Sequence, residues 1–302
     1  TAGEYSVQVD NGAGCYAFDT VNVFAQGGSS ETTLTFDGSN DYIAIDDFFY
    51  NSTGLTEVTV EAWIRTTSGG NQIIASYDRS EYWRFGINGN GAGTGQVCWN
   101  VRTNLGIFDF GSNSRVDDGL WHHVVGVFDN GTLSIYIDGV LDAQTNNGST
   151  FGTGVTRYGF ISSGSEATGF NGGRTPANEM NGSIDELRIW SVARTADQIR
   201  TDMCRSTVSD ATGLEQYWDL NEGTGFDVSE KASNYSGTMF NMTTTDWLTS
   251  GAPIGNESTF LYPGSWSGQS LNLVSCSGDE ITLSNVTGSP SGMHLYVVEG
   301  DP

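Results

Sequence analysis

Oxygen-bearing residues gather in a short glycine turn in the first part of the chain. The segment Asp37-Gly38-Ser39-Asn40-Asp41 places several side-chain and main-chain oxygens close together. Ca²⁺ binds about six to eight such oxygens at about 2.3–2.6 Å. We therefore predict a calcium site that includes Asp37, Asn40 and Asp41. The alternative is that these side chains only accept hydrogen bonds from the amides of the turn.

Two segments with alternating residue types form a second candidate site. In Tyr82–Ile87 and Val97–Arg102 every second residue is hydrophobic, so a strand would send those side chains into the core. The opposite face would carry Tyr82, Arg84, Asn100 and Arg102. A ring can stack on a sugar, and Arg and Asn can bond hydroxyls or carboxylates, so this face is a candidate for binding an anionic glycan. The alternative is a solvated face held by cross-strand hydrogen bonds.

The sequence offers little for catalysis. His122 and His123 are adjacent, and adjacent strand residues point to opposite faces, so their rings cannot bind one metal ion together. A glycosidase needs two carboxyl groups about 5–9.5 Å apart, whereas the neighbours Asp185 and Glu186 would diverge. We predict no catalytic residue, and a carboxylate pair drawn from different strands is the alternative.

The charge of the chain restricts its partners. The 302 residues include 36 acidic and 12 basic ones, for a net charge of −24. Such a field repels phosphate backbones and anionic lipids, so neither nucleic acid nor a membrane surface is an expected partner. The negative charge also attracts divalent cations. The alternative is that it keeps the protein soluble in a salty extracellular medium. No segment approaches the ~18 apolar residues of a membrane span, and we interpret the chain as a mature piece or interior fragment.

The middle of the chain, residues 31–256, has the pattern of an all-β sandwich. The chain has 41 glycines against 5 prolines, and short alternating segments are separated by turn signals. Asn130-Gly131 and Asp138-Gly139 predict two tight hairpin turns. Only Ser191–Met203 has helical character, with Thr195 as a candidate cap.

Five phrases in this middle region resemble a known family. They are Phe36–Ile43, Trp121–Val125, Gly182–Trp190, Ala193–Ile199 and Gly213–Gly225. Together they resemble the laminin-G-like, concanavalin A-like jelly roll of bacterial secreted and cell-surface proteins. The resemblance implies an all-β jelly-roll sandwich with one short helix. It also implies a structural calcium ion bound between the early turn and Asp185.

The two ends resemble pieces of immunoglobulin-like surface repeats. Residues 1–27 look like the closing strands of such a repeat and form a predicted hairpin, and residues 257–302 look like its opening strands. In an intact repeat, a cysteine of the opening strands and a cysteine of the closing strands would form a disulfide between the two sheets. The corresponding cysteines in this chain are Cys276 and Cys15. Either each cysteine has a partner outside this chain, or the two ends form one domain that the jelly roll interrupts.

The resemblance implies a binding module. We expect an extracellular adhesion or carbohydrate-binding module of a large surface protein, secreted or on the cell surface, non-catalytic and stabilised by calcium. Its partners would be a glycan or a cell-surface protein, with tandem repeats of the same chain. The alternatives are a structural spacer in a surface filament and, third, a polysaccharide-degrading enzyme.

Overall fold

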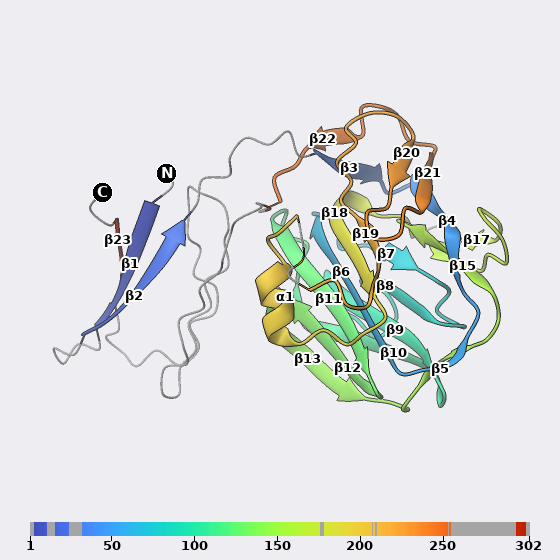
Figure 1. Ribbon diagram of the computed structural model, residues 1–302, viewed down its shortest axis with the longest axis horizontal. Helices are drawn as coiled ribbons and strands as arrows, with labels where there is room; N and C mark the ends of the chain where they lie inside the picture. The colour runs from blue at the N-terminus through green and yellow to red at the C-terminus, as the bar shows by residue number, and fades with distance from the viewer. Residues whose placement is uncertain are drawn as a thin grey trace. The chain divides into compact units, whose positions relative to one another are not determined.

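The chain folds into two units (Figure 1). The computed structural model describes residues 32–252 and 254, apart from 176, 177, 207 and 209, together with three strands near the ends. One unit comprises Thr1–Ser29, Arg200–Ser209 and Pro253–Pro302. The other comprises Ser30–Ile199 and Asp210–Ala252, and we call it the jelly-roll unit.

The first unit contains a three-stranded antiparallel sheet. Strands β1 (Gly3–Asp10) and β2 (Tyr16–Val23) form the hairpin that the sequence predicted. The third strand, β23 (His294–Glu299), comes from the other end of the chain and pairs with β1. Both ends therefore contribute to one sheet. Cys15, Cys276 and residues 257–293 lie outside the described residues, so the immunoglobulin-like assignment stays a prediction.

The larger sheet of the jelly-roll unit has ten strands in the order β20-β21-β4-β15-β7-β8-β9-β14-β5, with β10 paired to β9. In sequence order these strands are β4 (Tyr42–Tyr50), β5 (Thr53–Leu55), β7 (Gln72–Ser76), β8 (Trp83–Ile87), β9 (Gln96–Thr103), β10 (Gly106–Arg115), β14 (Phe151–Thr153), β15 (Arg157–Ile161), β20 (Asp227–Ser229) and β21 (Ser236–Phe240). All of the pairings are antiparallel.

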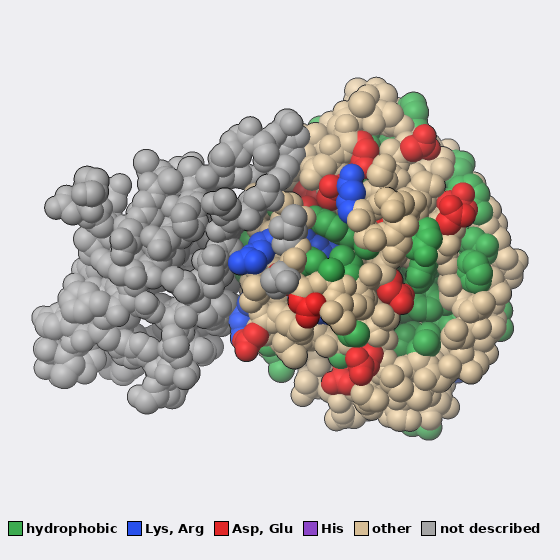
Figure 2. Space-filling view, viewed as in Figure 1, with side chains coloured by type: hydrophobic (Ala, Val, Ile, Leu, Met, Phe, Trp, Pro, Cys, Tyr) green, Lys and Arg blue, Asp and Glu red, His purple; other side chains and the backbone are tan. Residues whose placement is uncertain are grey.

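The smaller sheet has eight strands in the order β13-β12-β11-β6-β18-β3-β22, with β19 paired to β18. They are β3 (Thr32–Asp37), β6 (Glu57–Arg65), β11 (Trp121–Asp129), β12 (Thr132–Ile137), β13 (Val140–Asn146), β18 (Asn181–Trp190), β19 (Leu214–Trp218) and β22 (Trp247–Thr249). A separate short hairpin joins β16 (Gly164–Ser165) and β17 (Arg174–Thr175). The all-β jelly-roll prediction is confirmed. Acidic side chains are spread over the face of this unit seen in Figure 2.

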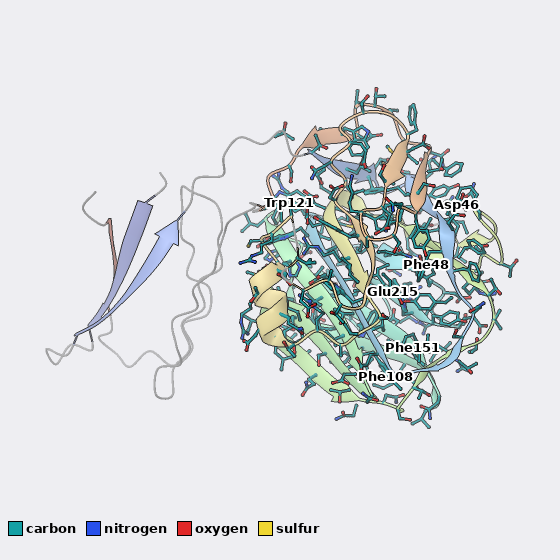
Figure 3. All side chains as sticks on the ribbon, viewed as in Figure 1. Asp46, Phe48, Phe108, Trp121, Phe151 and Glu215 are labelled. Carbon is teal, nitrogen blue, oxygen red and sulfur yellow. The ribbon has the colours of Figure 1, made fainter. Side chains whose placement is uncertain are left out.

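The core lies between the two sheets because alternate residues of each strand point inward. Val58, Val60, Ala62 and Ile64, which alternate along β6, are fully buried. Phe151 belongs to the same core, and Phe48 and Phe108 pack against its edge (Figure 3).

Trp99 on β9 and Gly126 on β11 bring the two sheets close together. A Cβ atom on residue 126 would lie 2.7 Å from Cδ2 of the Trp99 indole, so only glycine leaves room for the ring. The indole Nε1 of Trp99 also donates a hydrogen bond to the carbonyl oxygen of Val127 at 3.2 Å. Packing and hydrogen bonding thus hold β9 and β11, and with them the two sheets, together at the same place.

The turns and the helix follow local chemistry. Asn130, Gly131, Asp138 and Gly139 all have positive φ, from 48° to 97°, and join β11, β12 and β13 in two tight hairpins. Helix α1 (Ala196–Asp202) is the predicted helix, and the amide of Gln198 donates to Oγ1 of the Thr195 cap at 3.3 Å. It begins later than predicted, since the chain from Ser191 to Arg194 is not helical.

The outer faces of the two sheets are covered to different extents. On the smaller sheet, Ile199 of α1 packs with Val125 and Val127 of β11. On the larger sheet, Ala167 packs against Tyr42 and Phe160, which covers part of the face near β4 and β15. Half-buried polar side chains lie further along that face, on β8, β9 and β10.

Candidate ligand-binding face

A row of polar residues crosses the outer face of the larger sheet. The strand register places Ser76 beside Arg84, Arg84 beside Asn100, and Asn100 beside Asp109. The intervening residues Trp83 and Trp99 point into the core, as predicted. Because directly paired residues share a face, the four polar side chains form a continuous row across β7, β8, β9 and β10. We call this row and its neighbours the binding face.

Arg84 lies at the centre of the binding face and is half-buried. Its Nε and Nη2 atoms both donate to Oδ1 of Asn100, each at 3.3 Å. Asn100 is fully buried and its Nδ2 donates to the carbonyl oxygen of Asn90 at 2.8 Å. Burial lowers the pKa of Arg84, because desolvation disfavours its charged form. The arginine is therefore held in place by a neutral amide.

Two further arginines surround Arg84. Arg79 binds Asp109 through a bidentate contact, with Nε 2.7 Å from Oδ1 and Nη2 on Oδ2. Arg102 is half-buried and lies two residues beyond Asn100 on β9, on the same face. Its Cα lies diagonally across the strand pair from Arg84, at about 7–8 Å. Arg84, Asn100 and Arg102 are thus brought together as the sequence placed them, and their role in binding a ligand stays a prediction.

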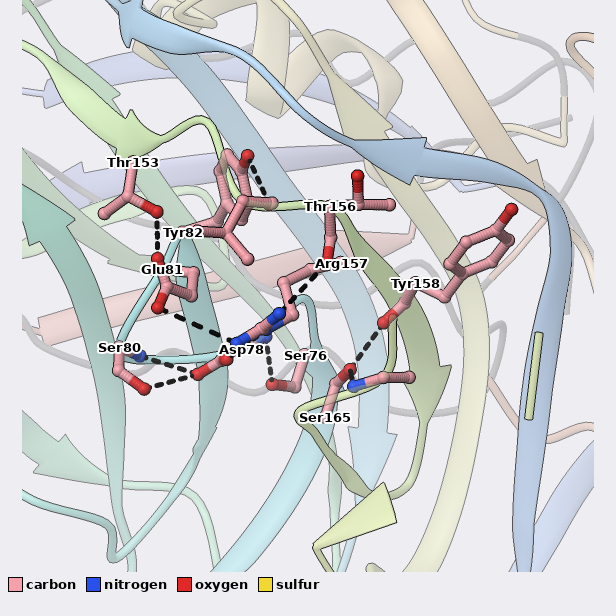
Figure 4. Close-up of polar contacts among 12 residues, drawn as sticks. Ser76, Asp78, Ser80, Glu81, Tyr82, Thr153, Thr156, Arg157, Tyr158 and Ser165 are labelled. Carbon is pink, nitrogen blue, oxygen red and sulfur yellow. Dashed lines mark hydrogen bonds and ion pairs between the residues drawn. The ribbon is translucent and has the colours of Figure 1, made fainter. Parts of the chain in front are cut away.

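A network of charged and hydroxyl groups borders the binding face (Figure 4). Arg157 Nε lies 2.5 Å from Oδ2 of Asp78, and its Nη2 lies 3.7 Å from Oε1 of Glu81. Ser80 donates to Oδ1 of Asp78 through both its amide and its hydroxyl, at 2.8 and 2.7 Å. Thr153 donates to Glu81. These bonds fix the loop between β7 and β8 against β15.

An aromatic pair that sequence analysis missed lies on the same face of the sheet. Phe49 on β4 and Tyr158 on β15 are cross-strand partners, with ring centroids 5.1 Å apart and planes at 30°. Phe49 is 40% exposed. Tyr158 is half-buried and packs with Phe160, the register partner of Ser76. Strand geometry puts Tyr158 about 12 Å from Arg84, two strands away and two residues along.

The expected position of Tyr82 is wrong. Tyr82 is fully buried, stacks on Tyr50 at 5.0 Å and donates from its hydroxyl to the carbonyl oxygen of Val155 at 2.8 Å. The residue precedes β8, so the alternation of the strand does not extend to it. Its ring belongs to the core, and the exposed ring on this face belongs to Phe49.

The predicted calcium residues are only partly brought together. Asp37, Asn40 and Asp41 share the turn between β3 and β4, where Oδ1 of Asp37 accepts from the amides of Ser39 at 2.7 Å and Asn40 at 3.3 Å. Asp41 is buried, and burial raises its pKa, aided by the charges of Asp37, Asp246 and Glu179 and opposed by the Asp37 amide that donates to it.

Asp185 lies away from that turn. The register pairs Asp37 with Asn181, so Asp185 lies four residues, or about 13 Å, further along β18. Its Oδ2 accepts from the hydroxyl of Ser250 at 2.5 Å and its Oδ1 from the amide of Glu186 at 2.9 Å. The predicted four-residue shell is therefore not assembled. Within the described part of the chain, no group of three or more His, Cys, Asp or Glu side chains is arranged to hold a metal ion.

The adjacent histidines of β11 have different surroundings. The two ring nitrogens of His122 contact Oδ2 of Asp138 at 2.8 Å and Oδ1 of Asp118 at 3.2 Å. His123 is fully buried, with Nε2 3.5 Å from Oε2 of Glu61. Burial, together with the positive charge of Arg188, lowers the pKa of His123 to about 3. These contacts are structural and do not bring the two rings to one ion.

Comparison with known proteins identifies the family. A family model described as the concanavalin A-like lectin/glucanases superfamily, of the laminin G type, matches residues 37–200, more than half of the chain. The chain belongs to this laminin-G-like superfamily. The match covers most of the jelly-roll unit and includes the binding face. The superfamily name covers both lectins and glucanases.

Solved structures with a similar fold are distant from this chain in sequence. A solved Bacteroides ovatus protein proposed to bind carbohydrate has a TM-score of 0.57 and 22% identity, with 85% of this chain and 72% of that chain covered. A heptameric pentraxin from Limulus polyphemus gives a TM-score of 0.46 and 14% identity over 69% of this chain and 95% of that one. The first shows that the laminin-G-like fold is shared.

A curated relative shares a shorter region. It is the rat sushi, von Willebrand factor type A, EGF and pentraxin domain-containing protein 1, which is 30% identical over 88 residues. The match spans 28% of this chain and only 2% of that relative. Among the described residues of this laminin-G-like chain, no helix combines the length and the apolar character that crossing a bilayer requires.

Proposed function

We propose that the jelly-roll unit is an extracellular, non-catalytic carbohydrate-binding or adhesion module whose ligand binds the outer face of the larger sheet. The observation that supports this most is that the exposed Phe49, stacked on the half-buried Tyr158, and the Arg84–Asn100 row lie on one face. A sugar offers an apolar ring face and a rim of hydroxyls, which match an aromatic surface beside arginines and amides.

The surrounding bonds favour a rigid, preformed site. Asn100 fixes the guanidinium of Arg84, Asp109 fixes Arg79, and Asp78 with Glu81 fixes Arg157. These side chains lose little further conformational entropy when a ligand binds, so less of the favourable interaction free energy is offset by the cost of ordering them. A spacer has no need of a preorganised face, which is why we favour a binding role.

Glycan binding can be tested with the full chain and with Phe49→Ala. We expect the wild type to bind at least one oligosaccharide of a neutral and acidic panel saturably in calorimetry. Truncation of Phe49 removes the stacking surface and should weaken binding about tenfold, since a ring–ligand contact contributes on the order of 1 kcal/mol or more.

The matched control for this test is Phe226→Ala. Phe226 is 48% exposed and lies just before β20, outside the aromatic pair. Its truncation should leave binding unchanged. If the panel gave no saturable binding, the spacer would replace the binding module as the better account.

Calcium is a separate proposal. The charges of Asp37, Asp246 and Glu179 around Asp41 support it, since mutually repelling carboxylates attract a cation. Asp185 lies too far along β18 to share one coordination shell with the residues of the turn. We propose that a stabilising ion binds at the turn with Asp41. We also propose that the protein is secreted, that its partner is a glycan or a cell-surface protein, and that the parent protein carries tandem copies of the chain.

A further inference from the structure

We propose that the binding face selects glycans that carry a carboxylate group, such as uronic acids, and that Arg84 binds this group. The inference rests on the proposed glycan-binding function and adds the class of ligand.

Arg84 has donors that the protein does not use. Nε and Nη2 share one acceptor, Oδ1 of Asn100, at 3.3 Å, which is long for a bond from a charged donor. Nη1 makes no hydrogen bond to any described residue, and it is not among the fully buried atoms that lack a partner. It therefore reaches solvent. A guanidinium whose donors are weakly used and reach solvent can bind both oxygens of a carboxylate.

The charges around Arg84 leave it uncompensated. Asp109 is bound by Arg79, and Asp78 and Glu81 are bound by Arg157. In the described part of the chain, neither Arg84 nor Arg102 forms an ion pair with a carboxylate. The four arginines on and beside the face are thus paired with only these three carboxylates, in a chain with only 12 basic residues. This local excess of positive charge favours an anion.

Partial burial makes Arg84 a stronger partner for a carboxylate. A half-buried guanidinium has lost part of its hydration and gains only one amide oxygen in return. A carboxylate at Nη1 would supply the missing opposite charge, which in a partly desolvated site is stronger than on an open surface. Arg102, about 7–8 Å away, could bind the same group or the next charged sugar.

The net charge of −24 does not contradict this preference. Long-range repulsion between the chain and an acidic glycan is screened beyond about 8 Å at physiological ionic strength. Hydrogen bonds from Arg84 act at contact distance and are screened much less. The net charge therefore slows association with polyanions, while the local site decides which sugar is retained.

The test compares acids with their own methyl esters. Oligomers of galacturonate, mannuronate, guluronate and glucuronate are each measured by calorimetry beside the fully methyl-esterified form, and neutral oligosaccharides are measured in parallel. We expect at least one acid to bind, with its ester at least tenfold weaker. In Arg84→Gln the acid should bind at least tenfold less tightly, while the affinity for the ester should stay the same.

Arg115→Gln is the matched control, because Arg115 is exposed, already pairs with Asp117 and lies opposite Gln96, about 13 Å along the sheet from Asn100. It should leave both affinities unchanged, and thermal unfolding confirms that each variant is folded. Equal binding of acid and ester, binding of neutral glycans alone, or an unchanged acid affinity in Arg84→Gln would overturn the inference and leave the proposed function standing. Absence of binding to every glycan, neutral or acidic, would overturn both.

Discussion

At the scale of single residues, burial decides which charged groups are structural. Arg188 is fully buried and binds Glu186, and the hydroxyl of Tyr217 donates to the same Glu186 carboxylate at 2.7 Å. Glu61 accepts a hydrogen bond from Nε1 of Trp190 at 2.9 Å. Such groups remain charged inside a protein only when they are paired. The Asp-Glu phrase of β18 therefore supports the fold, although the resemblance assigned its first residue, Asp185, to calcium.

The two adjacent histidines should titrate in opposite directions from the ordinary value of 6.5. Burial lowers the pKa of His122, but the hydrogen bond and charge of Asp138, with those of Asp118, outweigh burial and raise it. The stability that His122 contributes is complete below pH 6.5 and is lost as the pH rises through its folded pKa. His123, with its pKa lowered to about 3, contributes stability above pH 6.5 that is lost as the pH falls toward that value.

Ring-proton NMR of the histidines measures both effects. We expect the signal of His122 to titrate above pH 6.5, whereas the signal of His123 should remain neutral down to at least pH 5. The spectra of His122→Gln and His123→Gln assign the signals. If His123 titrated near pH 6.5, its ring would be exposed to water and the packing described for β11 would be wrong.

At the scale of elements, the sequence predicted most of what depends on local patterns. The alternation in β8 and β9 placed the core side chains correctly, and the dipeptides at Asn130 and Asp138 placed two hairpins. Strand register is set by distant partners and is much harder to predict from sequence. For that reason sequence analysis could not separate Asp185 from Asp37, and it missed the pairing of Phe49 with Tyr158.

Tyr82 shows a related limit. Alternation gives the face of a residue only while the chain remains in the strand, and Tyr82 lies just before β8. The burial of its ring depends on Tyr50, which lies far away in the sequence and comes close only through the larger sheet. The alternating pattern was extended to one residue before the strand begins, so the sequence predicted an exposed ring at Tyr82, where the structure has a buried one.

The strand register separates Asp41 from Asp185, so two variants can test where a calcium ion binds. If an ion binds at the turn between β3 and β4, excess EDTA should lower the melting temperature reversibly, because a ligand of the native state raises stability by mass action. Asp41→Asn should abolish the effect of EDTA, while Asp185→Asn should preserve it, since Asp185 is bound by Ser250. Loss of the effect in both variants would indicate one shared shell and contradict the separation described above.

At the scale of the whole molecule, the jelly-roll unit uses its two outer faces differently. Helix α1 covers part of the smaller sheet, whereas the larger sheet presents half-buried arginines and the exposed ring of Phe49. The laminin-G-like superfamily defines this fold but does not define a ligand, so the function has to be argued from the site.

The most direct test of this account is an experimental structure of the chain with the tightest-binding oligosaccharide of the panel. We predict sugar density on the outer face of the larger sheet, with one ring against Phe49 and a ligand oxygen within hydrogen-bond distance of Nη1 of Arg84. Density elsewhere, for example at the turn with Asp41 or on the outer face of the smaller sheet, would contradict the assignment of the binding face.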